Sequence, residues 1–274
     1  MKTDHPIGIG GKLAIDIAQD AARMAGTILK SEFGGIRNIS YKGRGNIVTE
    51  MDTKVESAIF EILGREFPNM YLAGEESTSD PIPAQGYSWI VDPLDGTRNY
   101  ASGIPFFSVV VGLVHDGEVL LGVNYDPMLD EMFSATRGEG AFLNGKSLNV
   151  GKGKTLDQCI LGMDMSYNNE GAANGLEVIQ SIWPGMQTLR VNGSSALGIS
   201  YVAAGRTDLY FNHQLAPWDQ VAGLILVEEA GGISTDRSGN RATIYSDGII
   251  ATTPSLLNQF MEATDGMSWR EPTH

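Results

Sequence analysis

The sequence has 274 residues and a net charge of −14, because 33 Asp and Glu residues outnumber 19 Lys and Arg residues. Hydrophobic residues make up 42% of it and charged residues 19%, a balance that is ordinary for a globular protein and argues against disorder. A surface this acidic repels phosphate backbones and anionic lipid headgroups, so we expect neither nucleic acid nor a membrane as a general partner.

The single cysteine, Cys159, excludes an internal disulfide and any metal site built from several cysteines. We interpret it as a small, buried hydrophobic residue. No apolar stretch approaches the ~20 residues of a membrane span. Residues 1–12 lack the apolar core of a signal peptide. The sequence therefore predicts a cytoplasmic protein.

The first half of the chain predicts two helices followed by strands. Apolar residues from Leu13 to Ile28 recur at helical spacing, and Gly34 and Gly35 end this helix. A second helical pattern follows the polar segment 49–52 and ends at Pro68. Short apolar or β-branched runs then predict an antiparallel meander covered by the two helices, with strands at 88–91, 107–114, 119–124 and 131–135.

The second half alternates strands with helices. The predicted strands are 160–163, 189–191, 209–211 and 249–251, and the predicted helices are 172–182, 195–204, 218–230 and 254–263. Glycines and lysines at 151–154 suggest a boundary between residues 1–150 and residues 151–274. The predicted fold class is α+β in the first half and α/β-like in the smaller second half, with helices layered against two sheets.

Carboxylates gather beside small residues at four places, which are 74–77, 92–97, Trp218-Asp219 and Asp52. The segment 92–97 is the most informative, because it follows a short apolar strand, at the end where ligand sites of such sheets lie. Asp92 and Asp95 are close enough in sequence to share a cation, Gly96 lets backbone approach a ligand, and Thr97 adds a hydroxyl. Hard oxygen ligands beside backbone N–H groups suit magnesium together with phosphate.

Each of these segments also has a purely structural interpretation. Pro-Leu-Asp-Gly is a good turn sequence, and Glu75 and Glu76 suit a solvated acidic loop. Asp219 and Asp52 each stand where a helix begins, where a carboxylate complements the helix dipole. Taken one at a time, the four segments leave both interpretations open.

Taken together, three strings resemble the inositol monophosphatase family. They are Gly-Glu-Glu-Ser at 74–77, Trp-Ile-Val-Asp-Pro-Leu-Asp-Gly-Thr-Arg-Asn-Tyr at 89–100 and Trp-Asp-Gln-Val-Ala-Gly-Leu-Ile-Leu-Val-Glu-Glu-Ala-Gly-Gly at 218–232. Shorter matches at 45–52, 103–109 and 193–197 stand in the family's order, so the resemblance covers about residues 13–262. It implies a layered αβαβα fold and a magnesium-dependent, lithium-sensitive phosphatase. Fructose-1,6-bisphosphatases and 3'-phosphonucleotide phosphatases belong to the same superfamily.

The resemblance also implies roles for individual residues. Two or three Mg²⁺ ions would be held by oxygen atoms of Glu75, Asp92, Leu94 (through its carbonyl), Asp95 and Asp219. Thr97, paired with Asp52, resembles the dyad that positions the attacking water, and Glu75 belongs with these catalytic groups. The backbone amides of Gly96 and Thr97 would hold the phosphate, and Glu76 would support the metal ligands from behind. Family members are commonly homodimers.

The resemblance is weaker where it concerns the substrate. Inositol-type members usually carry a carboxylate seven residues before the Trp-Asp aspartate, and here Asn212 stands there. An asparagine can still hydrogen-bond the hydroxyls of a substrate. Gly193, Ser194 and Ser195 match a loop beside the substrate ring, so the residues expected to contact the substrate include this loop, Asn212 and Asp219. Lys42 stands near the place of a lysine common in the family, but not in clean register with it. Arg98 and Arg190 could bind a second phosphate, although each suits a structural place on the surface better.

The expected substrate is inositol monophosphate or a similar polyol phosphate. Segment 103–109 also resembles members that take fructose-1,6-bisphosphate, so this ester stays an alternative, as do histidinol phosphate and 3'-phosphoadenosine 5'-phosphate. Outside this class, the chain could be a catalytically silent, metal-binding relative. The intact set of carboxylates favours the enzyme.

Overall fold

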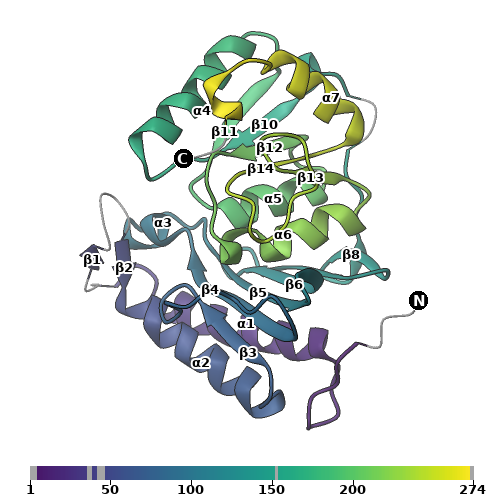
Figure 1. Ribbon diagram of the computed structural model, residues 1–274. Helices are drawn as coiled ribbons and strands as arrows, with labels where there is room; N and C mark the ends of the chain where they lie inside the picture. Colours follow the sequence, from purple (N-terminus) through teal and green to yellow (C-terminus); the bar gives the residue numbers. More distant parts are fainter. Residues whose placement is uncertain (1–4, 36–38, 42–46, 152–153, 272–274) are drawn as a thin grey trace.

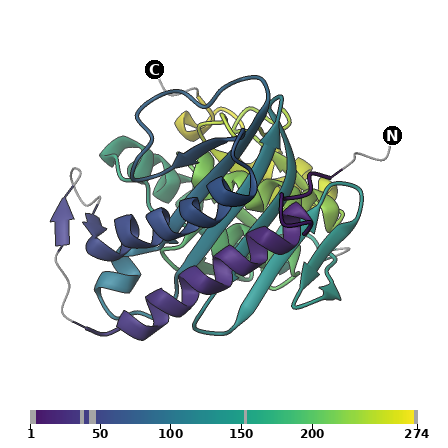
Figure 2. The same ribbon diagram turned by 90° about the horizontal axis from the view of Figure 1, so that it is seen from below.

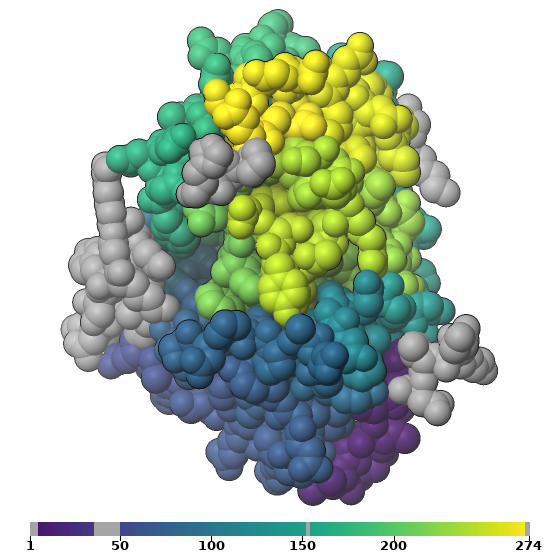
Figure 3. All heavy atoms as spheres, viewed as in Figure 1, coloured from purple at the N-terminus to yellow at the C-terminus, as the bar shows by residue number. Residues whose placement is uncertain are grey.

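A computed structural model describes residues 5–35, 39–41, 47–151 and 154–271 of the chain. Within these residues two large β-sheets alternate with three layers of helices (Figure 1), so the predicted αβαβα layering and the α+β fold class are confirmed. The N-terminal part occupies the lower half of the molecule in the space-filling view and the C-terminal part the upper half (Figure 3).

The first layer consists of α1 (Ala14–Glu32) and α2 (Glu50–Glu66). The two helices run side by side across one face of the first sheet (Figure 2). The apolar face of α1 is rich in alanine, and these small side chains let the helix lie close to the sheet. On α2, Val55, Ile59 and Leu63 are fully buried at helical spacing. Both helices were predicted from this periodicity.

The first sheet has seven strands in the order β3-β4-β5-β6-β7-β8-β9. The strands are β3 (Tyr71–Gly74), β4 (Tyr87–Asp95), β5 (Ser108–His115), β6 (Glu118–Asp126), β7 (Glu131–Thr136), β8 (Gly140–Leu143) and β9 (Lys146–Ser147). The central meander from β4 to β7 is antiparallel, as predicted. The edge strand β3 was not predicted, and it pairs parallel to β4. The short strands β8 and β9 were not predicted either.

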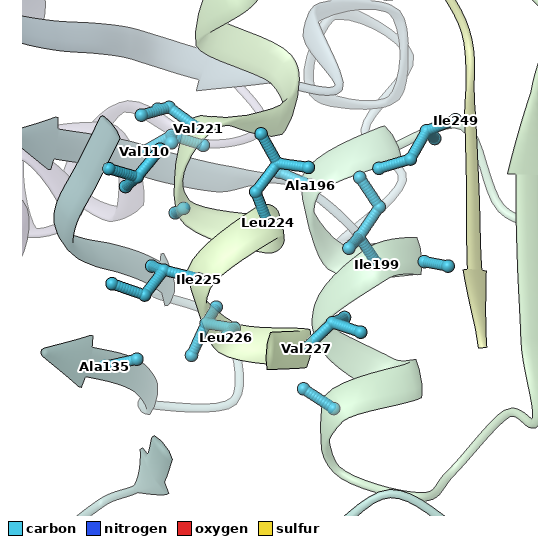
Figure 4. Close-up of a cluster of buried hydrophobic side chains, with 14 of the residues drawn as sticks. Val110, Ala135, Ala196, Ile199, Val221, Leu224, Ile225, Leu226, Val227 and Ile249 are labelled. Carbon is cyan, nitrogen blue, oxygen red and sulfur yellow. The ribbon is translucent and has the colours of Figure 1, made fainter. Parts of the chain in front are cut away.

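The middle layer consists of α5 (Ser195–Ala203) and α6 (Pro217–Glu229), which lie between the two sheets. Every residue of α6 from Gln220 to Val227 is buried, and Val221, Leu224 and Ile225 contribute to the core between the layers (Figure 4). The sheet has glycines beneath this helix, where a Cβ on Gly112 would come within 2.4 Å of Val221 Cγ2. A Cβ on Gly122 would come within 2.6 Å of Ala222 Cα. These glycines allow α6 to lie against the sheet backbone.

The second sheet has five strands in the order β11-β10-β12-β14-β13. They are β10 (Ile160–Met163), β11 (Thr188–Val191), β12 (Leu209–Asn212), β13 (Ile233–Thr235) and β14 (Ile249–Thr252). Strand β10 pairs parallel to β11 and β12, whereas β14 pairs antiparallel to β12 and β13. The outer layer consists of α4 (Asn169–Ile182) and α7 (Pro254–Ala263), which bury Cys159 in their shared core as predicted.

The remaining elements are short. They are β1 (Ile39–Tyr41) and β2 (Ile47–Thr49), which pair with each other, α3 (Thr97–Ala101), and two 3₁₀ turns at Leu156–Gln158 and Ser268–Arg270. Among the described residues, no helix has both the length and the apolar character needed to cross a membrane.

Candidate active site

The site begins where β4 changes register against β5. Asp92 pairs with Val110 and Asp95 with Ser108, so two residues on β4 stand against one on β5. Without this bulge, residues three apart on a strand would point to opposite faces of the sheet. The extra residue brings Asp92 and Asp95 to the same side. Pro93 lies in the irregular stretch, where a strand tolerates a residue without a backbone N–H.

Three carboxylates meet at this bulge. One oxygen from each of Asp92, Asp95 and Asp219 lies within 4.8 Å of the others. Asp219 comes from the first turn of α6, and its Oδ2 also accepts a hydrogen bond of 2.6 Å from the N–H of Ala216. Asp219 therefore fulfils both interpretations of its position, since it caps a helix and joins the cluster.

Burial and the charges of neighbouring carboxylates raise the pKa values of all three carboxyls. Burial, followed by the charges of Glu75, Asp95 and Asp219, raises the pKa of Asp92 well above its usual range. Burial, then Asp95 and Glu75, does the same to the pKa of Asp219. Burial also raises the pKa of Asp95 to about 6, against the lowering effect of its hydrogen bonds. Oxygen ligands this close and this poorly solvated suit a divalent cation, which would offset their mutual repulsion.

Glu75 lies at the edge of the cluster. It follows β3 directly, and its N–H donates to the carbonyl of Val91 on β4. Its charge raises the pKa of Asp92 and Asp219, although its carboxylate is not among the three that lie within 4.8 Å of one another. Its neighbour Glu76 donates its backbone N–H to the buried carboxylate of Glu56 at 2.9 Å.

Thr97 and Asp52 are brought together from distant parts of the chain. Thr97 Oγ1 lies 3.1 Å from Asp52 Oδ1 and 2.9 Å from the carbonyl oxygen of Leu94. Asp52 is buried in the first turn of α2, so this pair ties that helix to the end of β4. The Thr97 hydroxyl has a single proton, which either acceptor can take, and when Asp52 takes it the lone pairs of the Leu94 carbonyl are left for another partner.

Gly96 separates the carboxylates from Thr97 and has a positive φ of 92°. A Cβ there would lie 3.1 Å from the carbonyl oxygen of Phe106 and 3.3 Å from that of Gly193. The position therefore needs glycine for its backbone conformation and for the close approach of two other segments. The turn interpretation of this segment is wrong for the carboxylates, because Asp92 and Asp95 belong to the bulged strand β4 and only Gly96 lies in a turn.

The predicted substrate loop lies directly against the cluster. Asp95 accepts hydrogen bonds from the Ser194 hydroxyl and from the backbone N–H groups of Ser195 and Ala196, the latter two at 3.2 Å. Asn99 donates its side-chain amide to the carbonyls of Asn192 and Gly193 at 2.7 and 3.3 Å. The first turn of α5 is thereby tied to the first sheet.

Asn212 is the last residue of β12 and lies beside this loop. Its side chain is only 3% exposed, and its Nδ2 lies 3.2 Å from the Tyr210 hydroxyl and 3.3 Å from Ser195 Oγ. The structure thus places Asn212 close to Ser195 and almost entirely out of contact with solvent.

Three buried residues of the site were missed in the sequence, and two of them had a usable signal. Glu56 stands four residues after Asp52 and so shares its helix face. Asp164 follows directly after β10, in the same relation to its strand as the carboxylates that end β4. Asn99 stood within a matched string but carried no signal of its own.

The other candidate residues lie outside the cluster. Arg98 packs over the ring of Tyr167 at 4.6 Å, and Arg190 donates to Thr188 Oγ1 and to the Leu189 carbonyl. Both arginines have contacts within the chain, and whether either of them binds a phosphate stays a prediction. Lys42 and part of the matched segment 45–52 lie outside the described residues.

Comparison with known proteins gives a consistent result. The inositol monophosphatase family pattern matches residues 13–266. The chain is 37% identical over 259 residues to inositol monophosphatase 2 of Solanum lycopersicum, covering 91% of this chain and 97% of the relative. It is 34% identical over 250 residues to the Nus factor SuhB of Salmonella typhimurium, covering 90% and 94%.

A solved structure of an IMPase from Thermotoga maritima has a TM-score of 0.85 and 32% identity to this chain, covering 91% of this chain and 96% of the other. The match therefore extends over both sheets and all three helical layers. This protein belongs to the inositol monophosphatase family.

Proposed function

We propose that this protein is a Mg²⁺-dependent phosphomonoesterase that hydrolyses inositol monophosphate or a similar polyol phosphate. The observation that carries the proposal is the cluster of Asp92, Asp95 and Asp219, whose oxygens lie within 4.8 Å of one another. Membership of the inositol monophosphatase family supports it.

Two or three Mg²⁺ ions would be held by these three aspartates, with Glu75 and the Leu94 carbonyl as further ligands. The donor set fits, because all the atoms are hard oxygens and the carboxyls are close enough to share a cation. When bound, Mg²⁺ supplies the positive charge that lets an anionic ester approach a carboxylate-rich site and that activates water for attack.

The chain's own residues orient the reactants. By donating a hydrogen bond to Asp52, Thr97 Oγ1 turns its lone pairs toward an incoming water and accepts a hydrogen bond from that water. The backbone N–H groups of Gly96 and Thr97 hold the phosphate oxygens. Gly193, Ser194, Ser195 and Asp219 line the place for the alcohol part of the ester. Asn212 takes part through Ser195, which it contacts.

The test is phosphate release with and without Mg²⁺ from a panel of monoesters. The panel contains inositol 1-phosphate, fructose-1,6-bisphosphate, histidinol phosphate, 3'-phosphoadenosine 5'-phosphate and glycerol 2-phosphate. We expect Mg²⁺-dependent turnover with a preference for inositol 1-phosphate. Activity on the nucleotide alone would contradict the polyol assignment, and activity without any divalent cation would contradict the mechanism.

A catalytically silent, metal-binding relative is the second candidate. The relative named a Nus factor shows that family members carry names other than phosphatase. The three aspartates, Glu75 and the Thr97–Asp52 pair are all present in this chain, which favours the enzyme. Mg²⁺ binding by calorimetry without turnover of any ester in the panel would favour the silent relative instead.

We also propose a homodimer and a cytoplasmic location, both of which stay predictions. Large apolar side chains are exposed on α4, just after it and on the edge strand β11, namely Leu176, Trp183 and Val191. Light scattering checks the oligomeric state, and a monomer would contradict the proposal.

A further inference from the structure

We propose that Asp164 is a positioning residue for the substrate loop, which is formed by residues 192–195. We propose also that Asn212 holds this loop through Ser195 instead of binding the substrate. Asp164, Tyr210 and Asn212 form one hydrogen-bond network whose donors and acceptors are matched. The proposal rests on the proposed function, because it assigns the residues that set the shape of the same site.

Asp164 anchors the beginning of the loop. It follows β10, is only 8% exposed, and accepts hydrogen bonds at Oδ1 from the N–H groups of Asn192 and Gly193, at 3.0 and 2.6 Å. Its other oxygen accepts from the Tyr210 hydroxyl at 2.9 Å. Both oxygens are therefore occupied by groups of the second sheet and of the loop.

The hydrogen bonds to Asp164 determine which atoms donate and which accept in the rest of the network. Tyr210 gives its only hydroxyl proton to Asp164, so its oxygen is left as an acceptor. Asn212 Nδ2 fills this place at 3.2 Å and also donates to Ser195 Oγ at 3.3 Å. Asn212 Oδ1 accepts from the N–H of Gln214 at 3.2 Å. The amide orientation of Asn212 is thus determined at both of its ends.

This arrangement leaves Asn212 little to offer a ligand. Both hydrogens of its Nδ2 have partners, and the side chain is almost entirely buried. What Asn212 does contact is Ser195, whose backbone N–H binds Asp95. The loop is therefore held at one end by Asp164 and at the other by Asp95, so a change at Asp164 would reach the carboxylate cluster through the loop.

The network also explains why an amide suits position 212 in this chain. A carboxylate there would meet the Tyr210 oxygen with no proton between them, because that proton is already given to Asp164. It would also place a second carboxylate near Asp164, whose pKa burial already raises to about 6. A donor at 212 and a carboxylate at 164 are therefore matched to each other. If the two residue types were exchanged, Tyr210 would donate to position 212 and accept from position 164, so the same number of hydrogen bonds would form.

The experiment is a double-mutant cycle with Asp164→Asn, Asn212→Asp and the exchanged double variant. We expect each single variant to raise KM for the best ester about tenfold or more, because hydrogen bonds to a charged group would be lost or mismatched. The change in kcat should be smaller. The double variant should recover most of this loss. The Mg²⁺ affinity should change little in all three variants.

The matched control is Asp208→Asn, which alters a buried aspartate of the same sheet that binds Lys154 and the N–H of Ile160. We expect it to lower stability and leave KM unchanged. Additive effects of the two single variants on KM would overturn the network. A recovery of stability in the double variant without recovery of KM would overturn the positioning role.

A second measurement separates this proposal from the proposed function. Hydrogen exchange of the Asn192 and Gly193 amides should be faster in Asp164→Asn and in Asn212→Asp, and slower again in the double variant. Absence of turnover in the unchanged protein would refute the proposed function, while unchanged exchange in both single variants would refute the network.

Discussion

Asp95 accepts a hydrogen bond from the backbone N–H of Ser195, so a carboxylate at the end of β4 caps the first turn of α5. The same carboxylate lies within the cluster with Asp92 and Asp219. One side chain therefore connects the candidate metal site to the loop that would hold the substrate.

This connection makes Asp95→Asn the most direct test of the cluster. The amide oxygen can still accept from the loop, but the charge that a cation requires is lost. We expect turnover to fall below detection and Mg²⁺ affinity to fall at least tenfold, and we expect the folded protein to lose some stability, because the amide NH2 group replaces one of the two oxygens that accept from the N–H groups of Ser195 and Ala196. Calorimetry and thermal unfolding measure these quantities, with the exposed residue Asp80 changed to Asn as control. Retained turnover would remove Asp95 from the metal site.

Stability of the metal-free protein should fall as the pH rises. The pKa of Asp95 is raised from 3.8 to about 6, and burial and neighbouring carboxylates also raise the pKa values of Asp92 and Asp219 well above their usual range. The folded chain therefore binds more protons than the unfolded chain from about pH 4 upward, so the free energy of unfolding declines through and beyond pH 6.

Mg²⁺ should reverse this decline, since the cation stabilises the ionised carboxylates. At a concentration 100 times the dissociation constant, one site would add about 2.7 kcal/mol to the free energy of unfolding. Thermal unfolding from pH 5 to 8, with EDTA and with Mg²⁺, checks both statements, and a stabilisation by Mg²⁺ that shrinks as the pH rises would contradict them.

Thr97→Val should lower kcat about 100-fold, because the variant keeps the shape of the side chain and loses the hydroxyl that orients water. The Asp52 carboxylate would also lose its partner at 3.1 Å. Thr97→Ser keeps the hydroxyl and should retain most activity. Steady-state kinetics distinguishes the two, and equal activity of both variants would mean that the hydroxyl is not needed.

Gly96→Ala should destabilise the protein by about 1–3 kcal/mol, since the residue has a φ of 92° and a Cβ would make tight contacts with the carbonyl oxygens of Phe106 and Gly193. Gly138→Ala is the matched control, because Gly138 has a φ of 79° and nothing within 4 Å of its Cβ position. Denaturant unfolding compares the two. An equal loss in both variants would show that backbone strain alone matters and that the contact with Phe106 and Gly193 does not.

Lithium should inhibit the proposed activity at millimolar concentration, because family resemblance implies that Li⁺ takes one of the magnesium positions. Phosphate release at increasing LiCl, with KCl as the ionic-strength control, measures this effect. Equal rates in both salts would mean that the cation site of this chain differs from that of lithium-sensitive relatives.

The main elements could be predicted because their signals are local. The helices α1, α2 and α7 follow from periodic apolar residues, and the meander from β-branched runs bounded by turns. Strands β3 and β13 are short and at sheet edges, so neither length nor alternation marked them. The parallel pairing of β3 with β4 depends on contacts between distant segments, which no local pattern encodes.

The candidate site could be predicted where its residues stand in matched strings, as with Asp92, Asp95 and Asp219. The bulge that turns Asp92 and Asp95 to one side was not predicted, because a bulge is defined only against the partner strand. Likewise, Asp164 becomes part of the site only when β10 and β12 pair side by side and bring it to Tyr210. The roles of the site residues and the division near residue 150 stay predictions.

The burial of α6 on all sides has a consequence for how the protein loses its structure. This helix follows residue 150 in the chain, yet it fills the space over Gly112 and Gly122 of the first sheet. Pulling the two sheets apart would expose an apolar face on each of them at the same moment. We therefore expect calorimetry to record a single cooperative transition, and a chain cut near residue 150 to yield two insoluble fragments that regain solubility only when refolded together.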